Sequence, residues 1–300
     1  MSERADRAAE RAERAAERAE PRPPDPHCPR CYGRGYLRAE SPEGDALALA
    51  CSCRPRCTRC EGRGVIDGRD AQGYAVVRRC ACRAFDQRLA LCNAARIPAA
   101  CWQSEFHDPP AAFLLDRHVQ RAWTHGQRFA ATYEPRAPGF LLHGGPGTLK
   151  TSILCATLAY LTLDRGIDCR FIEFSLLLNQ IREGLDGGAP AQRLEPLRRA
   201  TVLAIDELGK MRATEWERTI LDDLISSRYQ AKRTTLFATN FPATKPEGAS
   251  GRSPARGARA QPVETLEEAV GERIYSRLVS MGEFLHTGNT DLRRRSDVPS

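Results

Sequence analysis

The sequence lacks a long apolar run and contains few aromatic side chains. No stretch approaches the roughly 18 consecutive apolar residues that a membrane span needs, so we expect no membrane partner. Residues 1–20 alternate acidic and basic side chains without an apolar segment, which excludes a secretory signal and predicts a cytoplasmic protein. Hydrophobic residues make up 41% and aromatic residues 7% of the 300 residues, enough for one sizeable core but not for one that runs the whole length.

A strong excess of one charge is also absent. The 45 Lys and Arg residues exceed the 38 Asp and Glu residues by a formal net charge of +7. Arginine is compatible with binding to the phosphate backbone of DNA. Spread over this length, however, the excess identifies no DNA-contacting residue.

Cysteine is present and clustered, since eight of the 12 cysteines lie between Cys28 and Cys82. The cluster consists of two quartets: Cys28, Cys31, Cys51 and Cys53, and then Cys57, Cys60, Cys80 and Cys82. Each cysteine of the first quartet recurs 29 positions later, and the flanking letters CPRCYGRGY and CTRCEGRGV repeat as well. Residues 27–83 are therefore an internal duplication of a C-x-x-C-x-G-x-G unit that ends in C-x-C.

Clustered cysteines in a reducing compartment indicate metal or redox chemistry rather than structural disulfides. A C-x-x-C turn lets two thiolates hold one ion, and the spacer of each unit can form a short hairpin that returns the second pair. We therefore expect two four-thiolate zinc sites, each contributing a folding free energy on the order of 10 kcal/mol. Pairing within a unit is favoured by the periodicity. A catalytic thiol pair and an interleaved pairing of the two units stay open as alternatives.

The C-x-x-C-x-G-x-G phrase resembles the zinc repeats of DnaJ-type co-chaperones. Those repeats have four C-x-x-C pairs, whereas two of the four pairs here are C-x-C. The chain also has no His-Pro-Asp tripeptide, which a J-domain would carry. A chaperone function is therefore disfavoured.

From residue 139 onward, short apolar runs alternate with longer amphipathic segments. The candidate strands are 139–143, 169–174, 201–206 and 234–239, and the candidate helices are 150–164, 175–184, 213–231 and 263–281. Strands spaced by helices predict an α/β fold with a parallel, doubly wound sheet. Residues 243–262 are rich in Gly, Pro and Arg, which predicts a disordered insertion.

The first candidate strand leads directly into the turn GGPGTLKTS and then into a helix, the context that a P-loop requires. Backbone N–H groups of the turn and the positive end of the helix can cradle phosphates. We expect Lys150 to reach the β- and γ-phosphates of ATP, and Thr151 to place its hydroxyl on Mg²⁺. The expected ATP-binding residues are Gly144, Gly145, Pro146, Gly147, Thr148, Leu149, Lys150, Thr151, Ser152, Asp206 and Asn240.

Leu149 departs from the P-loop pattern G-x-x-x-x-G-K-[ST], because it stands where the pattern has Gly. A side chain at this tight turn implies a strain of about 1–3 kcal/mol. Weakened or lost ATP binding is the alternative that Leu149 keeps open.

Two acids follow the apolar run VLAI at the end of the third candidate strand. This pattern predicts a Walker B site, in which Asp206 holds Mg²⁺ through water and Glu207 polarises the attacking water as general base. The next strand ends at Asn240, which is placed to sense the γ-phosphate. Since the carboxyl ends of parallel strands meet at one edge, we expect these side chains to lie together.

These motifs together resemble the DnaC/IstB-type branch of the AAA+ ATPases, the helicase loaders and transposition helpers. The resemblance covers roughly residues 96–293 and rests on RIPAACW, GGPGTLKTS, FIEFSLLL, VLAIDELG, LFATNFP, GERIYSRL and GNTDLR. It implies a P-loop AAA+ parallel sheet flanked by helices. It also implies that Arg277 is an arginine finger acting on a neighbouring subunit's ATP, with Arg273 as the alternative and Arg293 in a sensor role.

The implied function is an ATPase of DNA replication that loads a replicative helicase onto single-stranded DNA and forms a homo-oligomer on ATP binding. A Cys-rich module before such an ATPase also resembles DnaI-type loaders. The alternatives are a helper ATPase for a transposase and a non-hydrolysing, zinc-containing adaptor with a degenerate nucleotide site. The expected parts are a charged helix and Pro-rich linker (1–26), the zinc module (27–83), a helical connector (84–135), the AAA+ domain (136–293) and a tail (294–300).

Overall fold

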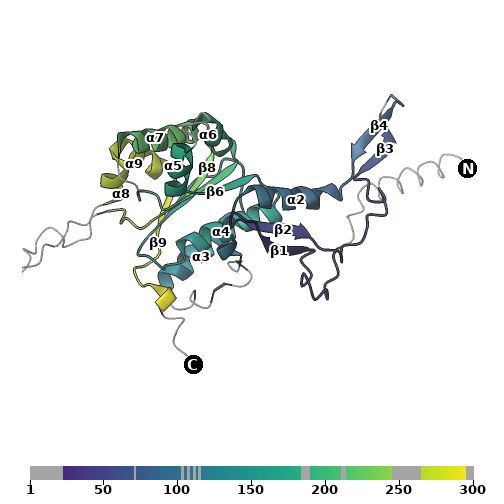
Figure 1. Cartoon of the computed structure of the whole chain (residues 1–300), viewed down its shortest axis with the longest axis horizontal. Coiled ribbons are helices and arrows are strands. Elements are labelled where there is room, and N and C mark those ends of the chain that lie inside the picture. The colour runs from purple at the N-terminus through teal and green to yellow at the C-terminus, as the bar shows by residue number, and fades with distance from the viewer. Residues whose placement is uncertain are drawn as a thin grey trace, which may run out of the picture. The chain divides into compact units, whose positions relative to one another are not determined.

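The computed structural model of the chain describes residues 23–294, with gaps at 71, 103–104, 107–108, 111–112, 114–115, 184–189, 211–213 and 245–264. The expected N-terminal charged helix, most of the insertion expected at 243–262 and nearly all of the tail lie outside these described residues. The chain divides into two compact units (Figure 1). One consists of Met1–Arg38 and Ala48–Leu89, and the other of Ala39–Leu47 and Ala90–Ser300.

The Cys-rich segment contains one β-hairpin in each repeat, as its spacers predict. The hairpins pair β1 (Tyr36–Glu40) with β2 (Ala46–Ala50), and β3 (Val65–Arg69) with β4 (Ala75–Arg79). Each strand of the first repeat has its counterpart 29 positions later in the second. Few apolar side chains are buried here: one cluster consists of three cysteines, with Leu37 and Cys53 packed against it. So small a core needs another source of stability, such as bound metal.

Helices connect the hairpins to the sheet of the second unit. They are α2 (Arg83–Ala94), the short 3₁₀ turn η1 (Ala99–Cys101) and α3 (Arg117–Ala131). Helix α3 begins after Asp116, whose side chain accepts a hydrogen bond from the backbone N–H of His118 and so caps the helix. Trp123 of α3 is buried and makes an edge-to-face contact with Phe106 at 5.4 Å between ring centroids.

The second unit is built on a five-stranded sheet in the order β6-β7-β8-β5-β9, and every pair in it is parallel. The strands are β5 (Gly139–His143), β6 (Cys169–Glu173), β7 (Val202–Asp206), β8 (Thr234–Thr239) and β9 (Gly282–His286). Every residue of β7 and β8 is buried, as expected for central strands covered on both faces. The predicted parallel α/β sheet is confirmed.

Helices cover both faces of this sheet (Figure 1). They are α4 (Lys150–Leu163), α5 (Phe174–Glu183), α6 (Pro190–Arg199), α7 (Glu215–Gln230), α8 (Leu266–Val270) and α9 (Glu272–Met281). Helices α3 and α4 lie on one side, and α5, α6, α7 and α9 on the other. On the second side, their buried side chains form one apolar cluster with residues of β5, β7 and β8. No helix within the described ranges is long and apolar enough to cross a membrane.

Two helical segments differ from the sequence-based expectation. The single helix predicted at 263–281 is in fact two, because Gly271 between them adopts a φ of 89°, a left-handed conformation that favours glycine. Helix α6 was not predicted, and it contains Pro196, a residue that normally ends a helix pattern.

The carboxyl end of α6 is held by a buried arginine from α7. The guanidinium of Arg228 donates hydrogen bonds to the carbonyl oxygens of Leu197 (2.7 Å) and Ala200 (2.9 Å), and to the hydroxyl of Thr235 (2.9 Å). Arg228 has no exposed surface, and burial lowers its pKa to about 9. These bonds satisfy helix-end carbonyls that have no partner inside the helix. They tie α6, α7 and β8 together.

Candidate functional site

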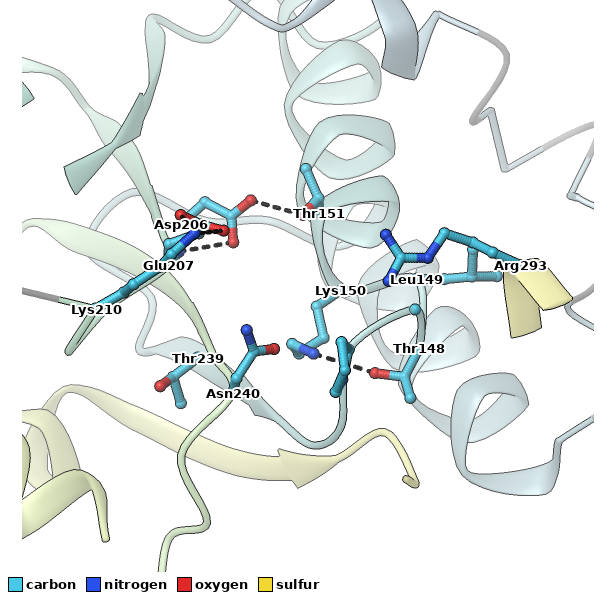
Figure 2. A pocket seen from close by; sticks show the side chains of 12 residues that line it. Thr148, Leu149, Lys150, Thr151, Asp206, Glu207, Lys210, Thr239, Asn240 and Arg293 are labelled. Carbon is cyan, nitrogen blue, oxygen red and sulfur yellow. Dashed lines mark hydrogen bonds and ion pairs between the residues drawn. The ribbon is translucent and has the colours of Figure 1, made fainter. Parts of the chain in front are cut away.

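A pocket lies at the carboxyl ends of the central strands, beside the turn that leads into α4 (Figure 2). Its lining residues are Pro146, Gly147, Thr148, Leu149, Lys150, Thr151, Asp206, Glu207, Lys210, Thr239, Asn240 and Arg293. The structure therefore brings together most of the residues that the sequence predicts for a nucleotide site. Gly144, Gly145 and Ser152 belong to the same turn and helix start but do not line the pocket.

The segment that follows β9 lies close against the backbone of this turn. A Cβ at Gly144 would lie 2.4 Å from the carbonyl oxygen of Gly288, and one at Gly147 would lie 1.9 Å from a carboxylate oxygen of Asp291. The backbone N–H of Gly145 also donates to the Gly288 carbonyl at 2.9 Å. At Gly144 the neighbour is backbone, so no side chain would fit, whereas at Gly147 the neighbour is a movable carboxylate and the φ of 74° is what favours glycine.

Lys150 is folded onto the carbonyl oxygens of its own turn. Its Nζ donates to the carbonyls of Gly144 (3.0 Å) and Gly145 (2.7 Å) and to the hydroxyl of Thr148 (3.2 Å). Burial lowers the pKa of Lys150 to about 8, although the carboxylate of Asp206 acts in the opposite direction. Among the described residues the ammonium has no anionic group in direct contact, and a phosphate would supply one.

Asp206 and Thr151 form the polar centre of the pocket. The hydroxyl of Thr151 donates to one carboxylate oxygen of Asp206 at 2.6 Å, and the backbone N–H of Glu207 donates to the other at 2.8 Å. Burial raises the pKa of Asp206, while these two hydrogen bonds lower it. A hydroxyl and a carboxylate are hard oxygen donors of the kind that Mg²⁺ prefers. The donor set therefore fits magnesium.

Glu207 is engaged by a lysine three residues further on. Lys210 Nζ lies 2.9 Å and 2.8 Å from the two carboxylate oxygens of Glu207, which raises the pKa of Lys210 (Figure 2). The side chain of Lys210 is 64% exposed, and an exposed ion pair of this kind contributes at most about 1 kcal/mol. Glu207 can therefore leave Lys210 at little cost. Lys210 is not among the site residues predicted from the sequence, although its i,i+3 spacing from an acid is visible there.

A third acid, Glu173, stands at the end of β6 and was missed from the sequence. Burial raises its pKa, and the neighbouring carboxylates of Glu207 and Asp206 add to this effect. Its side chain accepts a hydrogen bond from the hydroxyl of Ser175. The only sequence signal was its place at the end of an apolar run, which the Asp206-Glu207 pair shares.

The three arginines implied by the family resemblance lie in different settings. Arg293 lines the pocket and pairs with Asp291, with Nε 3.2 Å from a carboxylate oxygen. Arg277 is bound to Asp222 of α7 at 2.6 Å and is 20% exposed, whereas Arg273 is 75% exposed. Neither Arg277 nor Arg273 lines the described pocket, so the arginine-finger role stays a prediction.

The cysteine thiols are grouped by repeat. Within each quartet the four sulfur atoms lie within 4.8 Å of one another. Two of the sulfur–sulfur distances are 3.8 and 3.4 Å in the first quartet, and two are 3.7 and 3.5 Å in the second. A tetrahedral site with Zn–S bonds of about 2.3 Å separates its sulfurs by about 3.8 Å. The thiols therefore fit zinc in each repeat, and the interleaved pairing is not adopted.

Backbone groups prepare these thiols for metal binding. The N–H of Gly35 donates to the sulfur of Cys31, and the N–H of Gly64 donates to that of Cys60, both at 3.3 Å. The backbone N–H groups of Cys31 and Arg30 also lower the pKa of Cys28 to about 7. Such hydrogen bonds favour the thiolate, the form that binds metal.

Comparisons with known proteins agree with the geometry of the pocket. Residues 129–247 match the family model described as IstB-like ATP binding protein. The chain is 25% identical over 121 residues to the replicative helicase loader DnaC of Escherichia coli K12, covering 40% of this chain and 49% of that protein. It is also 25% identical over 118 residues to DnaC of Buchnera aphidicola, covering 38% and 48% respectively. The chain thus spans about half the length of the curated relatives it matches.

The fold is similar to that of a solved helicase loader. A crystal structure of the DnaC helicase loader superposes with a TM-score of 0.50 at 24% identity, covering 62% of this chain and 98% of that one. This likeness shows the fold, a parallel α/β sheet flanked by helices, that the motifs predict.

Leu149 provides a test of backbone strain in the turn. It adopts φ 58° and ψ 19°, the left-handed conformation, at the N-cap of α4. We expect Leu149→Gly to be more stable than Leu149→Ala by about 1 kcal/mol, because alanine keeps the strain and glycine removes it. Urea unfolding of the two variants measures this difference. Equal stability would show that the turn is not strained.

The lowered pKa of Lys150 predicts how the affinity for a triphosphate depends on pH. Lys150 loses its proton near pH 8 in the free protein, whereas a bound triphosphate would raise that pKa, so binding above pH 8 takes up a proton. We expect affinity to change little below pH 8 and to fall by up to about tenfold per pH unit above it. Calorimetric titration between pH 7 and 9.5 measures this. Lys150→Arg should flatten the profile, because arginine stays charged; a flat profile in the unsubstituted protein would contradict the assignment.

Proposed function

Because the chain carries a DnaC/IstB-type AAA+ domain, we propose that it binds ATP with Mg²⁺ in the pocket at the ends of β5, β7 and β8 and hydrolyses it. The observation that carries this proposal is the convergence of Lys150, Thr151 and Asp206 at one edge of the sheet. Leu149 lines this pocket and adopts the left-handed conformation that the turn needs.

Each polar group of the pocket has a role in this reaction. Lys150 exchanges its carbonyl partners for the β- and γ-phosphates. Thr151 and Asp206 would hold Mg²⁺, which would supply positive charge beside the phosphates. Glu207 leaves Lys210 and accepts a proton from the water that attacks the γ-phosphorus. The bond from that phosphorus to the bridging oxygen breaks, and ADP leaves with the electron pair. Asn240 contacts the γ-phosphate and distinguishes ATP from ADP.

We further propose that ATP binding drives assembly with a replicative helicase, and that hydrolysis releases this partner once it is loaded onto single-stranded DNA. The support is the 25% identity to proteins described as replicative helicase loaders. Arg277, released from Asp222, or the more exposed Arg273 would contact the ATP of a neighbouring copy in a homo-oligomer. A helper ATPase for a transposase is the second candidate, and the IstB-like family match favours it.

Two variants separate binding from hydrolysis. Lys150→Ala removes the ammonium that meets the phosphates and should abolish ATP binding. Glu207→Gln keeps the shape but loses the proton acceptor, so it should bind ATP and lower turnover by at least about 100-fold. Equilibrium binding of labelled ATP and phosphate release measure the two effects.

The same variants test the partner. Glu207→Gln used as bait with ATP in a lysate of the native cell should capture a replicative helicase, and Lys150→Ala should not. Capture of a transposase instead would select the second candidate. Equal capture by both variants would show that ATP does not control the partner.

We also propose that each cysteine quartet binds one zinc ion. Metal analysis of the purified chain should find about two zinc ions, and Cys31→Ser or Cys60→Ser should each remove about one, since each breaks one four-thiolate site. Cys92→Ser, outside both quartets, is the matched control. Loss of both ions from either single variant would contradict independent sites, and absence of metal would remove the assignment.

A further inference from the structure

The positive charge of the chain is concentrated in the Cys-rich unit, residues 23–38 and 48–89. This unit contains 12 arginines, no lysine and five acids, so its charge difference equals the +7 of the whole chain. Each four-thiolate zinc site would add a net charge of −2, and the unit would still carry about +3. Zinc binding alone does not require such an excess of arginine.

Four of these arginines line one groove in the unit. The lining side chains include Arg54, Arg56, Arg59 and Arg83, together with cysteine and glycine positions of the two repeats. The one acid among the described residues that line it is Asp86, which is paired with Arg54 at 3.2 Å. The groove is therefore strongly positive.

The duplication itself positions two of these arginines. Arg54 and Arg83 are equivalent, because each directly follows the C-x-C of its repeat. Each side chain lies across the second glycine of its own C-x-G-x-G: a Cβ at Gly35 would come 3.4 Å from Cδ of Arg54, and one at Gly64 would come 2.5 Å from Cδ of Arg83. The glycines give the arginine stems room against the backbone.

The guanidinium of Arg54 is further fixed by the start of α2. It lies over the ring of Phe85, with Cζ 3.6 Å from the ring centroid, and its side chain is only 18% exposed. An arginine held in this way loses little conformational freedom when it binds an anion. The groove is preorganised rather than a chance gathering of solvated charges.

From these observations we propose that the groove binds the phosphodiester backbone of single-stranded nucleic acid. The planar fork of arginine matches two oxygens of a phosphate, and such contacts need no base sequence. The same unit also exposes the ring of Tyr32 (76%), which offers a stacking face for an unpaired base. An acidic peptide has no base to stack on this ring, and a duplex hides the faces of its bases.

This inference deepens the proposed function, and rests on it for the choice of DNA as the natural ligand. It assigns DNA contact to residues outside the ATP pocket. The binding step needs neither Lys150 nor Glu207, so the two proposals can fail separately.

The test compares two pairs of substitutions that remove the same charge. Arg56→Gln with Arg59→Gln alters the groove, whereas Arg69→Gln with Arg78→Gln alters the β3–β4 hairpin, which does not line it. Fluorescence anisotropy with a labelled 20-nucleotide oligothymidylate follows binding to the full chain between 50 and 200 mM salt. Zinc content and circular dichroism confirm that each variant is folded.

We expect the groove pair to weaken binding about tenfold or more at 100 mM salt and the hairpin pair to weaken it less than about threefold. The slope of log affinity against log salt should fall by about 1.4 in the groove pair, the value for two lost phosphate contacts on a single strand. Lys150→Ala should keep the DNA affinity even where ATP binding is lost.

Several outcomes would overturn the assignment. Equal losses in the two pairs would show a diffuse charge effect, and no loss in the groove pair would place the contact elsewhere. Tighter binding of the matching duplex would exclude a single-strand site. Displacement of the oligonucleotide by polyglutamate at equal charge concentration would identify an acidic protein partner instead.

Discussion

The hydrogen bond between Thr151 and Asp206 joins the two halves of the pocket, and the remaining geometry depends on it. Asp206 ends a fully buried strand, and an unbonded carboxylate at that depth would cost several kcal/mol. The hydroxyl at the start of α4 supplies one hydrogen bond, and the backbone of Glu207 supplies the other. The sheet and helix α4 are thus held in register by a side chain whose oxygen atoms also fit magnesium.

Much of the fold was predictable because its signals are local. The strands and the cysteine hairpins follow from apolar runs and a fixed repeat, and the pocket follows from the rule that parallel strands present their carboxyl ends at one edge. The structure places Lys150, Thr151, Asp206, Glu207 and Asn240 there, as that rule predicts.

The features that the sequence did not predict depend on contacts between distant residues or on unusual backbone conformations. Helix α6 forms although it contains Pro196. Its carboxyl end is hydrogen-bonded by Arg228, which is distant in sequence. The break at Gly271 depends on one residue with positive φ, which an amphipathic pattern does not reveal. Residues 287–291 contact the turn that leads into α4, and this contact likewise joins segments that lie far apart in the sequence. Lys210 was not predicted, because exposed lysines are common and the sequence does not show its close contact with Glu207.

The buried guanidinium of Arg228 constrains how this fold can change over evolutionary time. It donates hydrogen bonds to neutral carbonyl oxygens at the carboxyl end of α6. These oxygens face the guanidinium only when the helix end has one particular rotation about its axis. An insertion or deletion of one residue just before β7 would rotate these carbonyl oxygens by about 100°. The buried guanidinium would then lack its hydrogen-bond acceptors. Length variation among descendants of this sequence should therefore accumulate before α6 rather than between α6 and β7.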